Sequence, residues 1–441
     1  MPVSRVDGHA DLVITVTMLL VFLGLMALRA PVSISIGVAS AFGVFLAGVP
    51  LEIVPRKMTE GVDSFALLAV PFFVLAGNLM NSGGVTRRIF DFARALLGHL
   101  HGGLAHVNVG ASMIFSGMSG AALADLAGLG IVEMKAMRES GYRAEFAAGL
   151  TLASCTIGVI IPPSISFVIY ALVTGESTGR LFLAGVVPGV LIGASLMITV
   201  YAWARLRPDQ FSPPEPFRLA RLFKATRESA LALLLPVIIV ACLVLGVATV
   251  TEVGVIAVVY ALLLGFVHRE HSLTGLRHCL VESLSTSALI MYILAVSTVM
   301  GWVITSERDA HDAAWAISEA VDSPLAALGL INIFLLVVGM VLEPLPALLI
   351  TASILHPVIT SIGIDPVHFG VIICFNLILG IITPPMGIGL FVAARVANVP
   401  VEGVLRGTIP FLVPLFASLA VITVFPQISL WLPDLVYGPR P

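Results

Sequence analysis

Two copies of a Gly-x-x-x-Pro-Pro motif, at residues 158–163 and 380–385, carry the clearest chemical signal in the sequence. Proline has no backbone N–H, so each proline leaves the carbonyl four residues before it without a helical partner. A carbonyl freed in this way inside a membrane needs a ligand, and a sodium ion coordinated by backbone oxygens would serve. Each proline pair also begins a half-helix whose N-terminus suits an anion. A helix that is merely kinked is the alternative, but two copies favour a site.

Two further apolar runs, 103–132 and 325–360, are interrupted by residues that break a helix. Irregular backbone at membrane depth is tolerated only inside protein or beside a water-filled cavity. We therefore expect two re-entrant helical hairpins, at 103–138 and 325–360. The first tip offers hydroxyls and flexible backbone, and the second offers a carboxylate between two breaks. The tip residues are Ser116, Gly117, Ser119 and Gly120 in the first hairpin and Glu343, Pro344 and Pro346 in the second.

Acids and amides on apolar elements are the next candidates. A carboxylate at membrane depth is expensive, which makes Glu343 a functional candidate by default. Asp125, beyond the first tip, could bind an ion or could cap or pair with a neighbouring helix. An isolated amide or hydroxyl more often bonds one helix to another. The residues that we single out for contact with a substrate are Asn78, Ser154, Ser164, Asn376 and Gly387.

Residues 117–120 also match the Gly-x-Ser-Gly pattern of intramembrane serine proteases. Such an enzyme needs a histidine to activate Ser119. His356 and His368 are candidates, but both are predicted near the outer face. The sequence has no HExxH, no nucleotide-binding motif and no Cys/His metal spacing. We therefore expect no cofactor and no metal beyond sodium as a coupling ion, with energy from an ion gradient or another subunit.

The composition places all these residues in a membrane. The chain has 441 residues, of which 11% are charged and 58% hydrophobic, with a mean hydropathy of +1.06. Soluble domains carry about 25% charge, so a soluble enzyme and a disordered chain are both excluded. A dozen spans of about 20 residues would leave only short loops. The net charge of −3 gives no support for a nucleic-acid partner. We predict an all-α polytopic membrane protein.

The distribution of Lys and Arg sets the orientation. The longest polar loop, 205–228, holds six basic residues and is placed in the cytoplasm. Counting spans in both directions from this loop puts both termini on the outer side.

An internal repeat connects the two halves. A shift of 222 residues aligns 117–188 with 339–410 without a gap, and the identities concentrate on Gly and Pro. These residues have backbone roles, so the matches are not those of two unrelated apolar segments. The copies lie an odd number of crossings apart and so have opposite orientation. Inverted repeats with broken helices are typical of secondary transporters.

The motifs together resemble one known family over nearly the whole chain, from the first span to about Pro426. They are SGMSGAALADLAGLG (116–130), IGVIIPPSISF (157–167), LEPLPALLI (342–350) and the stretch from GIDPVHFGVI to NLILGIITPPMGIGLFV (363–392). They are similar to the large membrane subunit of tripartite ATP-independent periplasmic (TRAP) transporters.

The resemblance implies a sodium-coupled importer of organic acids, such as C4-dicarboxylates or sugar acids, in the bacterial inner membrane. It implies two partners, a small four-helix membrane subunit and a periplasmic substrate-binding protein. It also implies an elevator-type transporter like those of the ion transporter superfamily, in which a transport domain moves against a scaffold. The transport domain would comprise 65–172 and 279–394, and the scaffold 1–64, 173–278 and 395–441.

The resemblance further implies sodium sites at the hairpin tips and the neighbouring broken helices. Where many relatives have Asp after the Met of the second tip, this chain has Val341-Leu342-Glu343, so the acid has a longer arm. The residues that map onto the sodium sites are Ser116, Gly117, Ser119, Gly158, Pro162, Glu343, Gly380, Thr383 and Pro384.

Two alternative functions remain at this point. One is a stand-alone ion-coupled anion carrier of related fold that needs no binding protein. The other is the intramembrane protease, which is disfavoured because Val341, the repeat equivalent of Ser119, is no nucleophile.

Overall fold

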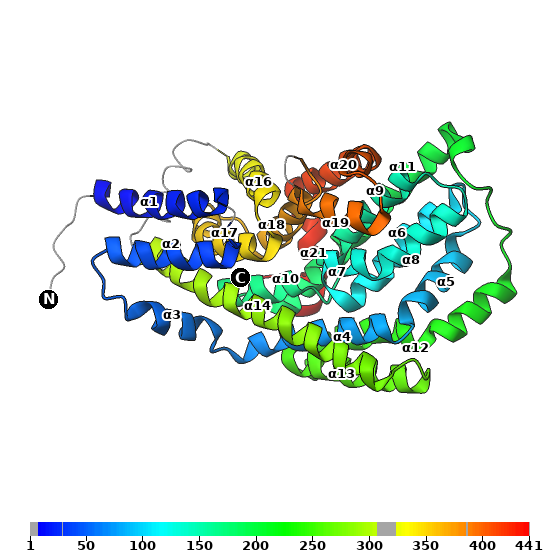
Figure 1. Ribbon diagram of the computed structural model, residues 1–441, viewed down its shortest axis with the longest axis horizontal. Coiled ribbons are helices and arrows are strands. Elements are labelled where there is room, and N and C mark those ends of the chain that lie inside the picture. The colour runs from blue at the N-terminus through cyan, green and yellow to red at the C-terminus, as the bar shows by residue number, and fades with distance from the viewer. Residues whose placement is uncertain (1–7, 29, 307–322, 385–386, 441) are drawn as a thin grey trace.

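The computed structural model describes residues 8–28, 30–306, 323–384 and 387–440 (Figure 1). Helices account for every regular element in these ranges. The first half contains α1 (Gly8–Ala27), α2 (Val32–Leu46), α3 (Ile53–Val62), α4 (Ala69–Ser82), α5 (Val85–Leu97), α6 (Gly103–Ser119), α7 (Ala122–Ala127), α8 (Leu129–Glu139), α9 (Ala144–Cys155), α10 (Ile165–Thr174) and α11 (Thr178–Leu206). The second half contains α12 (Leu219–Val244), α13 (Val250–Val267), α14 (Leu273–Ser306), α16 (Pro324–Val341), α17 (Pro344–Ser361), α18 (Pro366–Gly380), α19 (Ile388–Ala397), α20 (Val401–Val424) and α21 (Gln427–Tyr437).

Eight helices in the described ranges are long and apolar enough to cross a membrane. The chain is therefore an all-α polytopic membrane protein, as its composition predicts. The eight candidate segments are Phe65–Ser82, Thr178–Leu206, Leu219–Val244, Val250–Val267, Leu273–Ile304, Pro324–Val341, Pro344–Ser361 and Val401–Val424. Of these, Pro324–Val341 and Pro344–Ser361 are the two arms of the second hairpin.

Two other apolar segments are broken into pairs of short helices. In the first, α9 ends in a 3-10 turn (Thr156–Val159) and α10 begins at Ile165. In the second, α18 ends at Gly380 and α19 begins at Ile388. Both breaks contain the Gly-x-x-x-Pro-Pro motifs, because prolines cannot continue the hydrogen-bond ladder of the preceding helix. The breaks lie where the sequence predicts them, although Pro385 is outside the described residues.

Both predicted hairpins show a reversal of the chain. At the first tip Gly120 adopts a left-handed backbone conformation (φ 64°), which ends α6 before α7 and α8 return along it. At the second tip Leu342 and Glu343 are extended and Pro344 starts α17, which packs against α16. The tips thus project irregular backbone and polar side chains from two separate parts of the sequence.

Packing brings these tips and breaks together. Helix α6 contacts α4, α9 and the 3-10 turn of the first break, while α16 lies along α18. The long helix α14 contacts α4 and also α17 of the second hairpin. In Figure 1 the first hairpin (cyan) and the second broken segment (orange) accordingly meet in the middle of the molecule.

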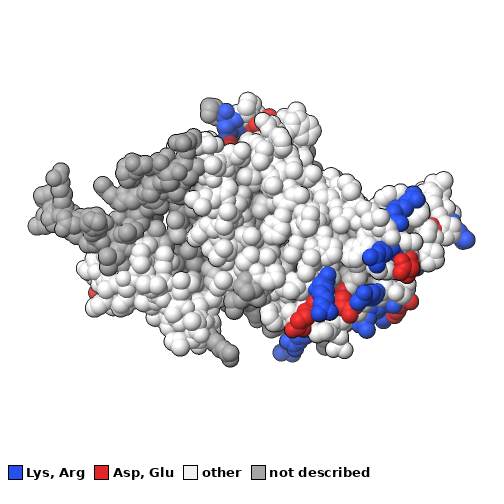
Figure 2. All heavy atoms as spheres, turned by 90° about the horizontal axis from the view of Figure 1, so that it is seen from above, with Lys and Arg blue, Asp and Glu red and all other residues white. Residues whose placement is uncertain are grey.

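Charged side chains are unevenly distributed over the described surface. On the face shown in Figure 2 most of them gather at the right-hand end and a smaller group lies at the top, whereas the middle of that face is almost uncharged. Figure 1 places α5, α8 and the connection from α11 to α12 at this end. This arrangement is typical of a protein whose apolar middle contacts lipid and whose charged loops contact water.

Candidate functional site

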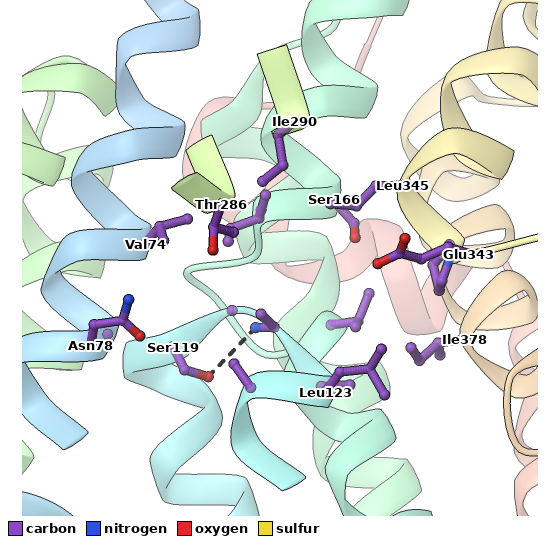
Figure 3. A pocket seen from close by; sticks show the side chains of 18 of the residues that line it. Val74, Asn78, Ser119, Leu123, Ser166, Thr286, Ile290, Glu343, Leu345 and Ile378 are labelled. Carbon is purple, nitrogen blue, oxygen red and sulfur yellow. Dashed lines mark hydrogen bonds between the residues drawn. The ribbon is translucent and has the colours of Figure 1, made fainter. Parts of the chain in front are cut away.

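A cavity of about 220 Å³ lies between the two hairpin tips. Figure 3 shows Ser119 on one side and the carboxylate of Glu343 pointing inward from the other. Helices α4 and α14 complete the wall with Asn78 and Thr286. The polar lining consists of Asn78, Asn81, Ser119, Ser166, Glu282, Thr286 and Glu343, among apolar residues that include Val74, Leu123, Val159, Ile165, Ile290, Leu345 and Ile378.

The charge of the described lining is unusual for an anion site. It contains two carboxylates, Glu282 and Glu343, but no Lys, Arg or His. No described residue donates a hydrogen bond to the Glu343 carboxylate, which leaves its oxygens available to a ligand. An anion that enters this cavity therefore needs a cation beside it.

The first hairpin tip is held by a serine–aspartate pair. Ser119 Oγ donates to Asp125 Oδ1 and accepts from the backbone N–H of Ala121 at 3.5 Å. Asp125 is 2% exposed. Because the left-handed Gly120 reverses the chain, α7 carries Asp125 back towards Ser119 although Asp125 lies six positions further along the sequence. Asp125, which the sequence left open, is thus part of the tip.

The first break lies directly against this tip. A Cβ added to Gly158 would lie 2.5 Å from Asp125 Oδ2 and 3.6 Å from Ser116 Oγ, so only a glycine admits this approach. Gly117 lies near the carbonyl of Pro162, and Gly120 lies against that of Pro163. The predicted sodium residues of the first half therefore form one cluster.

The second break is built on a contact between two glycines. A Cβ on Gly380 would lie 2.2 Å from the carbonyl carbon of Gly339, the repeat equivalent of Gly117. Thr383 Oγ1 donates to the carbonyl of Leu379 at 2.7 Å, and Pro384 is exposed beside it. Gly380 therefore packs directly against the second hairpin, and Thr383 and Pro384 follow it in the chain.

The prediction that four carbonyls are free was wrong for three of them. Val159 accepts from Ser164 Oγ at 2.5 Å, Gly380 accepts from the N–H of Thr383 at 3.0 Å, and Ile381 accepts from that of Gly389 at 2.9 Å. A tight turn and a serine replace the helical donors that proline removes. The carbonyl of Gly158 has no hydrogen-bond donor among the described residues, which keeps it as the best backbone ligand.

Of the five residues predicted to contact a substrate, one lines the cavity and four do not. Asn78 lines the cavity and donates to Ser283 Oγ at 2.9 Å. Asn376 instead donates to Asn332 on α16, at 2.7 Å to Oδ1. Ser164 caps the N-terminus of α10 by accepting from the N–H of Phe167. The remaining two candidates, Ser154 in a network between α6, α8 and α9 and Gly387 at the N-terminus of α19, do not line the cavity either.

Several cavity residues were missed from the sequence. Glu282, Thr286 and Ile290 recur every four residues and so share one face of α14, a spacing that could have identified them. Ser166 follows the first proline pair closely and could have been included with Ser164. Asn81 lies one turn beyond Asn78 on α4 and gives the same signal.

Comparison with known proteins shows the family to which this chain belongs. Residues 19–428 match the family described as tripartite ATP-independent periplasmic transporter, DctM component. The chain belongs to this family. It is thus a TRAP transporter large permease, as its motifs predict.

Three relatives align with most of the length of this chain. The sialic acid TRAP transporter large permease protein SiaM of Vibrio cholerae is 45% identical over 419 residues, which cover 95% of this chain and 98% of SiaM. The C4-dicarboxylate TRAP transporter large permease protein DctM of Pseudomonas aeruginosa is 38% identical over 379 residues, covering 86% and 88%. The sialic acid TRAP transporter permease protein SiaT of Haemophilus influenzae is 42% identical, and the match covers 86% of this chain and 62% of SiaT.

The fold has a solved counterpart. The YdaH transporter of Alcanivorax borkumensis superposes with a TM-score of 0.66 at 13% sequence identity, and the match covers 96% of this chain and 99% of YdaH. At this identity the likeness concerns the fold of a membrane transporter.

Proposed function

We propose that this large permease imports an organic carboxylate coupled to sodium, after delivery by a periplasmic binding protein. The observation that carries the proposal is the cavity between the hairpin tips, whose described lining is acidic and lacks a cationic side chain. A carboxylate in such a cavity requires bound cations. The clusters around Gly158 and around Gly380 offer oxygens for sodium on both sides of it.

The first sodium ion would bind Ser116, Ser119, Asp125 and the carbonyl of Gly158. The second would bind near Gly380, Thr383 and Glu343. Bound sodium would offset the negative charge of the lining and bring the substrate carboxylate into reach.

We favour a hydroxylated monocarboxylate, such as the sialic acid after which SiaM is named, over a dicarboxylate. Glu282 and Glu343 would repel a second carboxylate, whereas they can accept hydrogen bonds from substrate hydroxyls. Asn78 and Thr286 supply further hydrogen-bonding groups around the same cavity.

We propose that the protein lies in the bacterial inner membrane with both termini in the periplasm. We also propose that a small four-helix membrane subunit is its partner. Residues 65–172 and 279–394 would form the mobile transport domain, and the rest the scaffold. We propose no enzymatic activity, since Ser119 donates to Asp125 and neither His356 nor His368 lines the cavity.

Uptake into proteoliposomes that contain the large permease, its small subunit and the binding protein tests the proposal. We expect labelled sialic acid to accumulate under an inward sodium gradient, and excess succinate to compete poorly. Equal uptake with choline replacing sodium would refute the coupling. Strong competition by succinate would instead refute the preference for a monocarboxylate.

A further inference from the structure

A second polar cluster lies inside the first hairpin, apart from the cavity. It joins three helices: Asn108 and Ser112 come from α6, Glu133 from α8, and Thr151 and Ser154 from α9. Each of these side chains is at most 2% exposed. A buried carboxylate among neutral groups is costly unless it is neutralised, because it loses its hydration and gains no opposite charge.

The contacts in this cluster form a ring. Asn108 Nδ2 donates to Glu133 Oε2 at 2.8 Å, and Ser154 Oγ donates to Asn108 Oδ1 at 2.8 Å. Ser112 Oγ lies 3.0 Å from Ser154 Oγ and 3.4 Å from Glu133 Oε1. The second N–H of Asn108 is directed at Thr151 Oγ1, at 2.7 Å, which fixes the orientation of the amide.

When Glu133 is ionised, the ring has fewer O–H protons than it has contacts between oxygen atoms. Ser112 has one O–H but two oxygen neighbours. If it donates to Glu133, the single O–H of Ser154 can serve only one of Ser112 Oγ, Asn108 Oδ1 and the carbonyl of Thr151, which lies 3.0 Å from Ser154 Oγ. If it donates to Ser154, Glu133 Oε1 faces a lone pair.

A proton on Glu133 Oε1 completes the ring. The acid then donates to Ser112, Ser112 to Ser154, Ser154 to Asn108, and Asn108 back to Glu133 Oε2. Within the ring the acid, Ser112 and Ser154 each donate once, the Thr151 carbonyl stays as a second acceptor beside Ser154, and no buried charge remains. Buried polar networks are stable when every member is satisfied in this way.

The charged and titratable groups of the packed elements do not supply a counter-ion. Arg88 and Arg94 on α5 pair with Glu270 and Glu215, and Lys135 and Arg138 on α8 point to Glu139 and to the carbonyl of Ala397. The remaining groups are His106 on α6, Asp125 on α7, Glu145 (paired with Arg143) and Cys155 on α9, and the exposed Arg87, Asp91 and Arg395. His106 lies at the carbonyl of Gly102, and Asp125 and Cys155 add no positive charge.

We propose that Glu133 is a proton-binding site of the large permease, held by the ring of Asn108, Ser112 and Ser154. Loss of this proton opens the ring. Its effect reaches the first hairpin tip, because the carbonyl of Ser112 accepts from Ser116 and Ser154 lies one turn before Gly158. The site is separate from the proposed sodium and substrate sites and makes the first hairpin sensitive to pH.

Infrared spectroscopy of the purified full chain in lipid nanodiscs tests the proposal. We expect the Glu133→Gln variant to lack one C=O stretching band of a protonated carboxylic acid at neutral pH. The matched control is Glu139→Gln, which removes an exposed glutamate from the same helix and should leave that band intact. If Glu133→Gln instead keeps the C=O band and loses the bands of an ionised carboxylate, Glu133 is charged in the wild type and the proposal is overturned.

Two further measurements keep the test decisive. In the wild type, isotope-labelled glutamate should shift a protonated C=O band, a result that does not depend on the variant folding; failure to shift such a band would overturn the proposal. The wild type should also lose thermal stability as pH rises, since the unfolded chain releases the proton that the ring holds. Glu133→Gln should not show this loss, and identical pH profiles for both proteins would contradict a proton at Glu133.

Discussion

Asp125 shows at the scale of a single residue how backbone geometry makes a site. It lies six residues after Ser119, a separation that does not place two side chains on one face of a continuous helix. The reversal at Gly120 brings them into a hydrogen bond and places Asp125 beside Gly158. A carboxylate so buried has value only if something neutralises it, and sodium is the proposed partner.

We predict that Asp125→Asn weakens sodium binding by about tenfold or more, a loss of about 1.4 kcal/mol. The amide keeps the size of the side chain but removes the charge that attracts the ion. The measurement is the sodium concentration that gives half-maximal uptake in the complete system.

The control for this prediction is Asp209→Asn, which changes an exposed aspartate between α11 and α12. It should leave the sodium dependence unchanged. An unaltered sodium dependence in Asp125→Asn would remove this carboxylate from the ligand set.

At the scale of elements, glycines set how closely helices cross. A Cβ on Gly149 of α9 would lie 2.1 Å from the backbone carbon of Gly407 of α20. Gly185, the repeat equivalent of Gly407, lies as closely against the carbonyl of Ile160 in the first break. Another repeat pair, Gly141 and Gly363, shares a left-handed φ of 90° and 78°. The repeat identities therefore mark backbone contacts and turns.

We predict that Gly149→Ala lowers the stability of the purified protein by about 1–3 kcal/mol, because backbone cannot move aside as a flexible side chain can. Thermal unfolding in detergent measures the effect. Gly329→Ala on α16 is the matched control, since its Cβ meets nothing within 4 Å and alanine favours a helix. Equal stability of the two variants would show that α9 and α20 separate readily.

The loop before α12 is tied to α5 by a charged pair. Glu215 Oε1 lies 2.6 Å from Arg94, and Glu215 also pairs with Arg221. Partial burial opposes ionisation of Glu215, but the hydrogen bonds from Arg94 and Arg221 outweigh it and hold the pKa of Glu215 below its ordinary value. The stabilising contribution is therefore present at neutral pH and is lost as pH falls through the folded-state pKa.

We predict that Glu215→Gln costs less than about 1 kcal/mol at neutral pH, since such partly exposed pairs are screened by water. The difference from the wild type should shrink in acid, where Glu215 itself becomes neutral. Thermal unfolding of both proteins against pH measures this. If the stability difference between the two proteins grew in acid, the stabilising role of the ionised Glu215 would be contradicted.

At the scale of the whole molecule, the two halves of the repeat meet around one cavity. The first half supplies Ser119 and the second half supplies Glu343. Neither half could enclose the cavity alone. A rigid movement of both hairpins together would carry the cavity and its ions as one unit, which is what the proposed elevator requires.

We predict that the large permease alone does not import free substrate at the rate of the complete system. In the proposed function a periplasmic binding protein delivers the substrate, so the chain alone lacks that supply. Reconstitution with and without the small subunit and the binding protein measures the difference. Equal sodium-driven uptake by the chain alone would favour the stand-alone carrier.

The sequence by itself determined the helical membrane class, the two hairpins and the two broken segments. These features follow from local causes: apolar composition over a span, the N–H that proline lacks and the Cβ that glycine lacks. It also marked Ser119 and Glu343, because a polar tip within an apolar run has few structural explanations. Such signals survive in a single sequence since they do not depend on what lies across the fold.

Only the tertiary structure decided which polar side chain faces which partner. Asn78 and Asn376 are both amides on apolar helices, yet the first lines the cavity and the second bonds to Asn332. A helix that is apolar on all sides has no polar face to indicate its orientation, so rotation about its axis is set by packing alone. The ring around Glu133 was hidden for the same reason: it needs three helices in register before its hydrogen bonds can close.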